Sequence, residues 1–169
     1  SEMCIRDRYV RAKTMEAIEK THTRVDAALK AGGDAVGAQT IVETLPGMLP
    51  LNCNKRMNEL MVENSLLVNP DVDIKDAGHF SASTDMGDVS HLMPVIHPFI
   101  GGTNGLLHTA DFHVEDFNAA VLLPAKAFAM MLVDLLYDDA KEAKAILADF
   151  KPVLTKEEYI SKLDGYFNA

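Results

Sequence analysis

Hydrophobic residues recur at alternating steps of three and four between positions 15 and 29, a spacing that places them on one face of a helix. Thr14 is suited to cap this helix at its start, and Gly32-Gly33 is suited to end it, although residues 35–38 can extend it. The sequence therefore predicts a helix whose inward face is made of Met15, Ile18, His22, Val25 and Leu29.

Two short β-prone segments flank this helix. Residues 9–12 read as the end of one strand, and residues 39–44 alternate between two faces as a second strand does. Residues 9–45 therefore predict a strand–helix–strand unit, which is half of a small α+β sandwich and too little to bury a core of its own.

The pattern changes after two prolines and a glycine at residues 45–51, which we interpret as a domain junction. Asn54 can cap a helix that runs to about residue 67, with Met57, Leu60 and Met61 turned inward. A loop around Pro70 leads into the polar region 81–102, which contains a strand-like apolar run at 92–100.

Three more helices are predicted in the remaining sequence. The first is long, at about 114–137, and Pro124 should kink or divide it. Its apolar run, 119–137, is interrupted by Pro124, Lys126 and Asp134, which favours a buried core helix over a membrane span. A charged amphipathic helix follows at 138–150, and Thr155 opens a short last one.

Composition and charge limit the classes of function. The 169 residues carry a formal net charge of -9, which argues against nucleic-acid binding and against docking on an anionic membrane. The two cysteines do not make a disulfide framework or a CxxC pair, and we expect a cytoplasmic protein. Residues 1–8 have neither a periodic pattern nor signal-peptide anatomy, and we interpret them as a non-native tail, or alternatively as a short disordered native one.

The stretch Ser83-Thr84-Asp85-Met86-Gly87-Asp88-Val89-Ser90 carries the densest set of chemically useful side chains. Hydroxyl groups, carboxylates and a glycine this close together suit a loop at a helix N-terminus, where main-chain N–H groups can hold an anionic substrate group. The alternative is an ordinary helix start, capped by Ser83 or Thr84 and stabilised by Asp88 in its first turn.

Histidines are the other candidates. A neutral His108 is a possible zinc ligand that Asp111 could orient, or it is a hydrogen-bonded structural residue. His91 and His97 flank an apolar run and could line a cleft. The chain contains no HExxH pattern and no paired cysteines, so no local metal motif is present.

Taken together, the 83–90 stretch, His97-Pro98, Gly101-Gly102 and the run from His108 to Phe112 resemble the C-terminal catalytic segment of the aminoacylase/carboxypeptidase-type metal-dependent amidohydrolases. The most similar branch is that of p-aminobenzoyl-glutamate hydrolase and related N-acyl-amino-acid hydrolases. The resemblance implies an α/β fold in two domains, with the end of an α+β lid (dimerisation) domain at 9–47 and part of the catalytic domain at 48–169. It also implies two zinc or manganese ions, a homodimer formed through the lid, and cleavage of an N-acyl amino acid.

The resemblance assigns roles to individual residues. It implies that His108 is a metal ligand and that Ser83, Thr84 and Asp85 line the substrate site. Arg11 lies where a lid strand could contact a substrate carboxylate, although a solvated strand-edge charge is the alternative. His97 belongs to the motif without an assigned role. The other metal ligands and the glutamate base belong to a family segment absent here, so at most one ligand is present. We therefore expect the isolated chain to be inactive and to expose apolar surface.

Two other interpretations stay open. One is a complete, non-enzymatic small-ligand-binding or dimerisation module, which predicts a closed sheet. The other is a metal-free hydrolase that uses Ser83 or Ser90 with His108 and an aspartate. The sequence has no GxSxG nucleophile elbow in support of the second.

Overall fold

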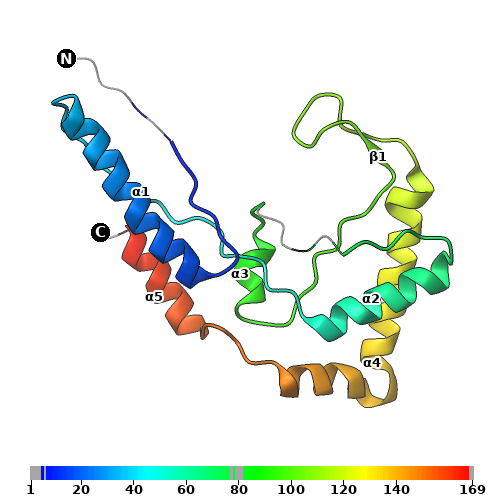
Figure 1. Cartoon of the computed structure of the whole chain (residues 1–169). Helices are drawn as coiled ribbons and strands as arrows, with labels where there is room; N and C mark the ends of the chain where they lie inside the picture. Colours follow the sequence, from blue (N-terminus) through cyan, green and yellow to red (C-terminus); the bar gives the residue numbers. More distant parts are fainter. Residues whose placement is uncertain (1–4, 6, 77, 79–81, 168–169) are drawn as a thin grey trace. The chain divides into compact units, whose positions relative to one another are not determined.

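The computed structural model describes residues 5, 7–76, 78 and 82–167, so most of the tail at 1–8 lies outside the described residues. The chain divides into two compact units (Figure 1). The first comprises Ser1–Asn52, Gly78–Leu92 and Pro152–Ala169, and the second comprises Cys53–Ala77 and Met93–Lys151.

Helix α1 (Met15–Ala35) of the first unit begins where the sequence predicts. The Thr14 hydroxyl caps it by accepting a hydrogen bond from the main-chain N–H of Ala17 at 3.2 Å. The helix continues past Gly32-Gly33, and the chain turns away at Gly37, whose φ is +69°. The predicted inward face is only half-buried, and α1 has no fully buried residue.

The two strands predicted beside α1 are not formed. Residues 9–12 and 39–44 belong to no sheet, and Ile41 is exposed. A strand is stable only when a neighbouring strand takes up its main-chain hydrogen bonds, and the described part of this unit offers none to either segment. The strand–helix–strand prediction is therefore correct for its helix and wrong for its strands.

Two further helices belong to the first unit: α3 (Met86–Ser90) and α5 (Lys156–Phe167). Thr155 opens α5 as predicted. Its hydroxyl accepts a hydrogen bond from the N–H of Glu158 at 3.1 Å, and the Glu158 carboxylate accepts one from the N–H of Thr155 at 2.7 Å. Lys162 of α5 forms an ion pair with Glu19 of α1 at 3.0 Å.

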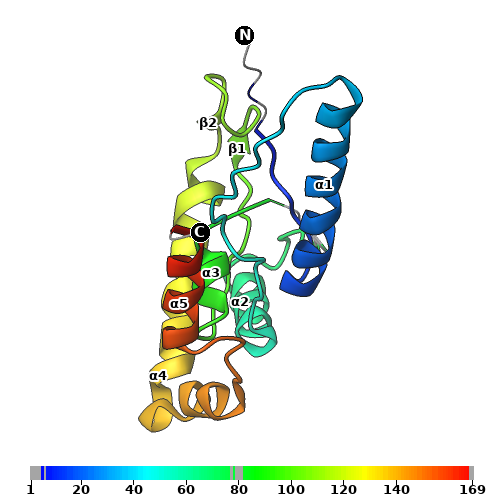
Figure 2. The same cartoon turned by 90° about the vertical axis from the view of Figure 1, so that its left-hand side faces the viewer.

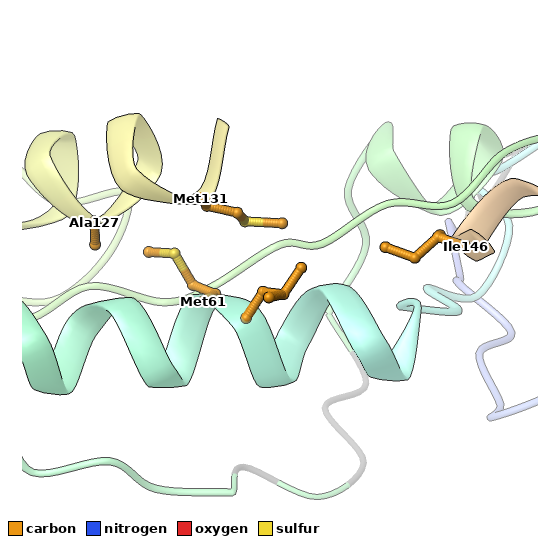
Figure 3. Close-up of a cluster of buried hydrophobic side chains, with 5 residues drawn as sticks. Met61, Ala127, Met131 and Ile146 are labelled. Carbon is orange, nitrogen blue, oxygen red and sulfur yellow. The ribbon is translucent and has the colours of Figure 1, made fainter. Parts of the chain in front are cut away.

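The second unit is built on α2 (Lys55–Val68), which packs against α4 (Leu123–Asp149). The Asn54 side chain caps α2 as predicted, by accepting a hydrogen bond from the N–H of Met57 at 3.0 Å. Figure 3 shows the small core that the two helices enclose, which consists of Leu60, Met61, Ala127, Met131 and Ile146.

Helix α4 consists of two helical segments, which confirms the predicted pair of helices at about 114–137 and 138–150. A π-helical turn, η1 (Asn118–Leu122), leads into it. Pro124 lies in the first turn of α4, directly after η1, and the helix changes there from the π to the α form without leaving helical φ/ψ angles. The break falls instead at residues 137–140, where Asp138, Asp139 and Ala140 have φ values of +52°, +56° and +57°.

One antiparallel hairpin is the only sheet in the described part of the chain. Its strands, β1 (Thr103–Asn104) and β2 (His113–Val114), lie side by side in Figure 2. The run at 92–100 forms no strand, although the N–H of Asn54 donates to the carbonyl of Val95 at 2.8 Å. The described structure is thus mostly helical rather than the expected α/β arrangement, and it contains no closed sheet.

The long apolar helix was expected to be buried, and it is buried on one side only. By length and composition alone, the helical stretch Asn118–Asp149 is long and apolar enough to span a membrane. In its most apolar segment of 18 residues, 11% is buried within the structure. Only three residues of α4 are fully buried: Ala127, Met131 and Ile146. Large apolar side chains therefore remain on its surface.

Candidate functional site

The polar stretch at 83–90 separates into two parts with different roles. In the first part, Asp85 is the cap of α3, because its carboxylate accepts a hydrogen bond from the N–H of Met86 at 3.0 Å. The Thr84 hydroxyl donates a hydrogen bond to the Asp85 carboxylate at 3.2 Å. Ser83, the preceding residue, is exposed. The cap is therefore one residue after Thr84 and two after Ser83, the residues that the sequence suggested.

The second part of the stretch holds a distant segment of main chain. The Asp88 carboxylate accepts a hydrogen bond from the N–H of Leu49, and the Ser90 hydroxyl accepts one from the N–H of Asn52, both at 3.0 Å. Gly87 is buried where a Cβ would collide with the carbonyl of Leu49. We call Gly87, Asp88, Ser90, His91 and the segment 49–52 the α3 clip.

His91 completes the α3 clip from a position that is only 5% exposed. Its Nε2 donates to the carbonyl oxygen of Pro50 at 2.8 Å, which places the proton on this nitrogen. Its own carbonyl accepts hydrogen bonds from the N–H groups of Val153 at 2.9 Å and Leu154 at 3.2 Å. His91 therefore joins three segments of the first unit, and it does not line a cleft as the sequence suggested.

The α3 clip also bears on the metal-free hydrolase interpretation. Ser90 is completely buried, its hydroxyl donates to the carbonyl of Gly87, and it accepts from Asn52. A nucleophilic serine needs a base within hydrogen-bonding distance and access to substrate. Ser90 has neither in the described structure, so it is a structural residue.

His108 lies in the loop that joins β1 to β2, and glycines shape this hairpin. Gly102 has a φ of +87°, and a Cβ there would lie 2.6 Å from the main-chain nitrogen of Ala120. Its carbonyl accepts hydrogen bonds from Glu115 and Asp116 at 3.0 Å. Gly105 has a φ of +89° and passes equally close to the main chain of Asp111. The second glycine of the Gly101-Gly102 motif is therefore needed for the turn that presents the loop.

His108 is exposed and has a φ of +65°, which is uncommon for a residue with a side chain. In the described structure its ring takes part in no hydrogen bond, so Asp111 does not orient it here. The main-chain carbonyl of Asp111 instead accepts from Nδ1 of His113 at 2.7 Å. Residues held in such backbone conformations are common at functional sites, and His108 is an accessible imidazole on a short, constrained loop.

The remaining candidates have ordinary surroundings. Arg11 is exposed, and its guanidinium lies 4.8 Å from the centre of the Tyr9 ring as a cation–π pair. His97 packs edge-on against Phe99, with ring centres 5.6 Å apart. Burial raises the pKa of the Cys53 thiol, against a smaller opposing effect of a hydrogen bond from the main chain of His97.

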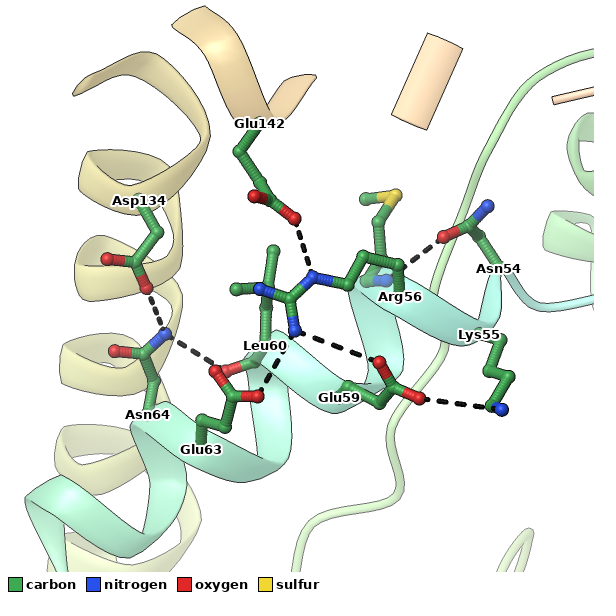
Figure 4. A network of polar contacts seen from close by, with 10 residues as sticks. Asn54, Lys55, Arg56, Glu59, Leu60, Glu63, Asn64, Asp134 and Glu142 are labelled. Carbon is green, nitrogen blue, oxygen red and sulfur yellow. Dashed lines mark hydrogen bonds and ion pairs between the residues drawn. The ribbon is translucent and has the colours of Figure 1, made fainter. Parts of the chain in front are cut away.

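A polar network joins α2 to α4 within the second unit (Figure 4). Arg56 contacts three carboxylates, those of Glu59, Glu63 and Glu142, and its hydrogen bond to Glu142 raises the pKa of the guanidinium. The Asn64 amide donates to the carboxylate of Asp134 at 2.6 Å. These contacts fix how the two helices pack, and none of them leaves a nucleophile beside a base.

The predicted site residues are distributed over both units. Arg11, Ser83, Thr84 and Asp85 belong to the first unit and His108 belongs to the second. Among the described residues, no three histidine, cysteine or acidic side chains are placed to hold one metal ion. A single imidazole without an accompanying carboxylate does not fit a pair of divalent ions, which need several ligands each.

Comparison with known proteins gives two relatives. The chain is 27% identical to the Xaa-Arg dipeptidase of Mus musculus in an alignment 164 positions long that covers 90% of this chain and 37% of that protein. It is 28% identical to the Xaa-Arg dipeptidase of Homo sapiens in an alignment 174 positions long that covers 92% of this chain and 37% of that protein. The chain thus spans just over a third of the length of these relatives.

No family model matches the chain. No solved structure matches it either. What the alignments establish is that this chain is distantly homologous to one part of the Xaa-Arg dipeptidases.

Proposed function

We propose that this chain is part of a metal-dependent hydrolase that cleaves the amide bond of small peptides or of N-acyl and N-aroyl amino acids. The observation that carries the proposal is the alignment of at least 90% of the chain with two dipeptidases. The motif around His108 is consistent with it, because the resemblance to metal-dependent amidohydrolases rests on residues of this loop and of the 83–90 stretch.

Within this proposal, His108 is a metal ligand, and Ser83, Thr84, Asp85 and Arg11 contact the substrate. An exposed imidazole on a glycine-shaped hairpin suits the first role, because the ring can reach a metal whose other ligands come from elsewhere. The described side chains do not fit two metal ions by themselves, so we assign no catalytic step to the isolated chain. We propose that the chain is inactive alone.

Two chemistries of the substrate can be separated experimentally. The relatives are named for dipeptides that end in arginine, whereas the sequence motif is most similar to hydrolases of p-aminobenzoyl-glutamate. Both substrates end in an α-carboxylate, but the side chain of the C-terminal residue is cationic in the first and anionic in the second. The homodimer formed through a lid domain and the cytoplasmic location belong to the same proposal.

The decisive experiment is a chimera in which this chain replaces the aligned part of the human Xaa-Arg dipeptidase. Hydrolysis of arginine dipeptides, p-aminobenzoyl-glutamate and N-acetyl amino acids is measured with and without zinc or manganese. We expect metal-dependent hydrolysis that His108→Ala abolishes and His113→Ala, in the same hairpin, preserves. A chimera that folds and binds metal but hydrolyses none of these substrates would contradict the proposal.

The isolated chain is assayed in parallel on the same panel. We expect no hydrolysis under any metal condition. Metal-dependent hydrolysis by the chain alone, lost in His108→Ala, would show that a complete site forms from these 169 residues and that the proposed inactivity is wrong.

A further inference from the structure

Asn104, the last residue of β1, is followed by a glycine, and both residues are exposed. It is the one asparagine of the sequence that precedes a glycine. The main-chain nitrogen that follows an asparagine is a nucleophile that can attack the side-chain amide, and the Cβ of the following residue normally shields it. Glycine has no Cβ, so the nitrogen of Gly105 lacks this shield.

The structure holds the two reacting groups close together. The N–H of Gly105 donates a hydrogen bond to Oδ1 of Asn104 at 2.7 Å. Because Cγ of Asn104 is one C=O bond, about 1.2 Å, from this oxygen, the Gly105 nitrogen lies within about 4 Å of the carbon that it would attack. Holding two groups at such a distance removes part of the entropic cost of their reaction.

A second contact determines which side of the amide faces Gly105. Nδ2 of Asn104 donates to Oε1 of Glu115 at 3.2 Å, so the amide nitrogen is turned toward Glu115 and the carbonyl toward Gly105. Gly105 is itself held at a φ of +89°, where the carbonyl oxygen of Asp111 lies 2.5 Å from the position of a Cβ. The hairpin therefore maintains the arrangement of Asn104 and Gly105.

We propose that Asn104 is a self-modification site, at which the Gly105 nitrogen displaces the side-chain amide as ammonia. A bond forms between this nitrogen and Cγ, the bond from Cγ to Nδ2 breaks, and the proton lost by the Gly105 nitrogen leaves with the ammonia. The product is a cyclic imide. The reaction needs only this chain and water, so it does not depend on the proposed function.

Water then opens the imide ring in one of two ways. If water adds at Cγ, the bond from Cγ to the Gly105 nitrogen breaks and an aspartate results. If water adds at the main-chain carbonyl carbon, the original peptide bond breaks and the chain continues through Cγ, which gives an isoaspartate. Each product contains one oxygen atom from the solvent in place of the amide nitrogen.

Both products disturb the hairpin that presents His108. The new carboxylate faces Glu115, to which the amide donated a hydrogen bond, so an attraction is replaced by a repulsion between like charges. The isoaspartate also lengthens the main chain by one atom beside the position where Asn104 pairs with His113. Because each strand has only two residues, we expect the pairing to be lost.

The test follows the purified chain during incubation at physiological pH and temperature, both folded and in guanidinium chloride. Peptide mass spectrometry in heavy-oxygen water measures the exchange of the amide for a solvent oxygen, and isoaspartate-specific methylation distinguishes the two products. We expect Asn104 of the folded chain to react no more than about threefold more slowly than in the denaturant, because the fold keeps the nitrogen near Cγ.

Two sites in the same chain are internal controls. Asp164 with Gly165 can form the same imide by losing water, but this pair lies within α5, where main-chain nitrogens are held in helical hydrogen bonds. Folding should therefore slow isomerisation at Asp164 much more than it slows the reaction at Asn104. Asn118 is exposed but is followed by alanine, and it should stay unmodified over the same period.

The matched variants are Asn104→Gln and Asn118→Gln. Asn104→Gln should remove the modification, because the larger ring that glutamine would have to close forms far more slowly, whereas Asn118→Gln should be modified as the parent chain is. Hydrogen exchange is followed at Glu115 and Asp116, whose N–H groups donate to the carbonyl of Gly102 at 3.0 Å. Their protection should fall in the parent chain and in Asn118→Gln as the modified fraction grows, and should stay constant in Asn104→Gln.

Three results would overturn the inference. The first is a reaction at Asn104 that folding slows beyond the stated limit. The second is a rate at Asp164 that folding preserves as fully as the rate at Asn104, since the hairpin would then confer nothing specific. The third is a modified chain whose Glu115 and Asp116 amides are as protected as those of the unmodified chain.

Discussion

Replacing Gly87 by alanine tests the α3 clip directly. A Cβ at this position would collide with the carbonyl oxygen of Leu49 and would lie 3.0 Å from its carbonyl carbon and 3.7 Å from the nitrogen of Leu51. These are main-chain atoms, so no flexible side chain can move aside. The segment 49–52 must therefore shift away from α3, and the hydrogen bonds of the clip must lengthen or break.

The size of the effect follows from three contributions. Overpacking against main chain costs about 1–3 kcal/mol. Each of the three hydrogen bonds between α3 and the segment 49–52 contributes about 0.5–1.5 kcal/mol, and a shift weakens all of them. Alanine in a helix offsets about 1 kcal/mol of this loss. We expect a net destabilisation of the first unit by about 1–4 kcal/mol.

The assay is urea unfolding monitored by circular dichroism, combined with hydrogen exchange at the amides of Leu49 and Asn52. These two N–H groups donate into the α3 clip, so their protection should fall in Gly87→Ala. The matched control is Gly32→Ala in α1, where no atom lies within 4 Å of the added methyl group. It should stabilise the chain by about 0.5–1 kcal/mol. Equal responses of the two variants, or a Gly87→Ala chain as stable as the parent, would refute the reasoning.

Three further predictions concern other parts of the chain. Ala140→Gly should raise the free energy of unfolding by about 0.5–1 kcal/mol, because Ala140 has a φ of +57°, which glycine adopts more readily than alanine. Ala145→Gly, in the regular part of α4, is the control and should lower the free energy of unfolding by a similar amount in the same denaturation assay. Thr155→Ala should cost about 1 kcal/mol through loss of the α5 cap. The main-chain N–H of Thr155 donates to the Glu158 carboxylate and lowers its pKa, and alanine at 155 keeps this N–H. Both the parent chain and Thr155→Ala should therefore lose helicity as the pH falls through the range where this glutamate protonates, whereas Glu158→Gln should not; identical acid titrations of the parent chain and Glu158→Gln would contradict this. Burial raises the pKa of Cys53, so iodoacetamide at pH near 8.5 should alkylate it more slowly in the folded chain than in urea, as peptide mass spectrometry would measure. Equal rates would argue against a shielded thiol.

Features that depend on neighbouring residues could be predicted from the sequence. Thr14, Asn54 and Thr155 all lie at helix starts, because a cap is made between residues three positions apart. The strands at 9–12 and 39–44 could not be judged in the same way. Their stability depends on partners that sequence periodicity does not specify, and the described structure supplies none.

The candidate site shows the same division. The sequence identified the 83–90 stretch but placed its chemistry in Ser83, Thr84 and Asp85, whereas the structure also gives an architectural role to Asp88, Ser90 and His91. One signal was present: Gly87, Ser90 and His91 follow the i, i+3, i+4 spacing of one helical face. Their partners are about forty positions away, and no local pattern connects the two. For His108, the residue type left a zinc ligand and a structural residue open, and only the family resemblance favoured the ligand.

The main-chain contacts of His91 also set an order of events during synthesis. The contacts that His91 makes with Val153 and Leu154 can form only after those residues have been translated. The second unit, by contrast, needs nothing beyond Lys151. Long-range contacts are slow to form because the intervening chain must first be ordered. The helical pair α2 and α4 should therefore assemble before His91 can make these contacts, and α1 must stay soluble on its own charged surface until α5, whose Lys162 pairs with Glu19 of α1, has been translated.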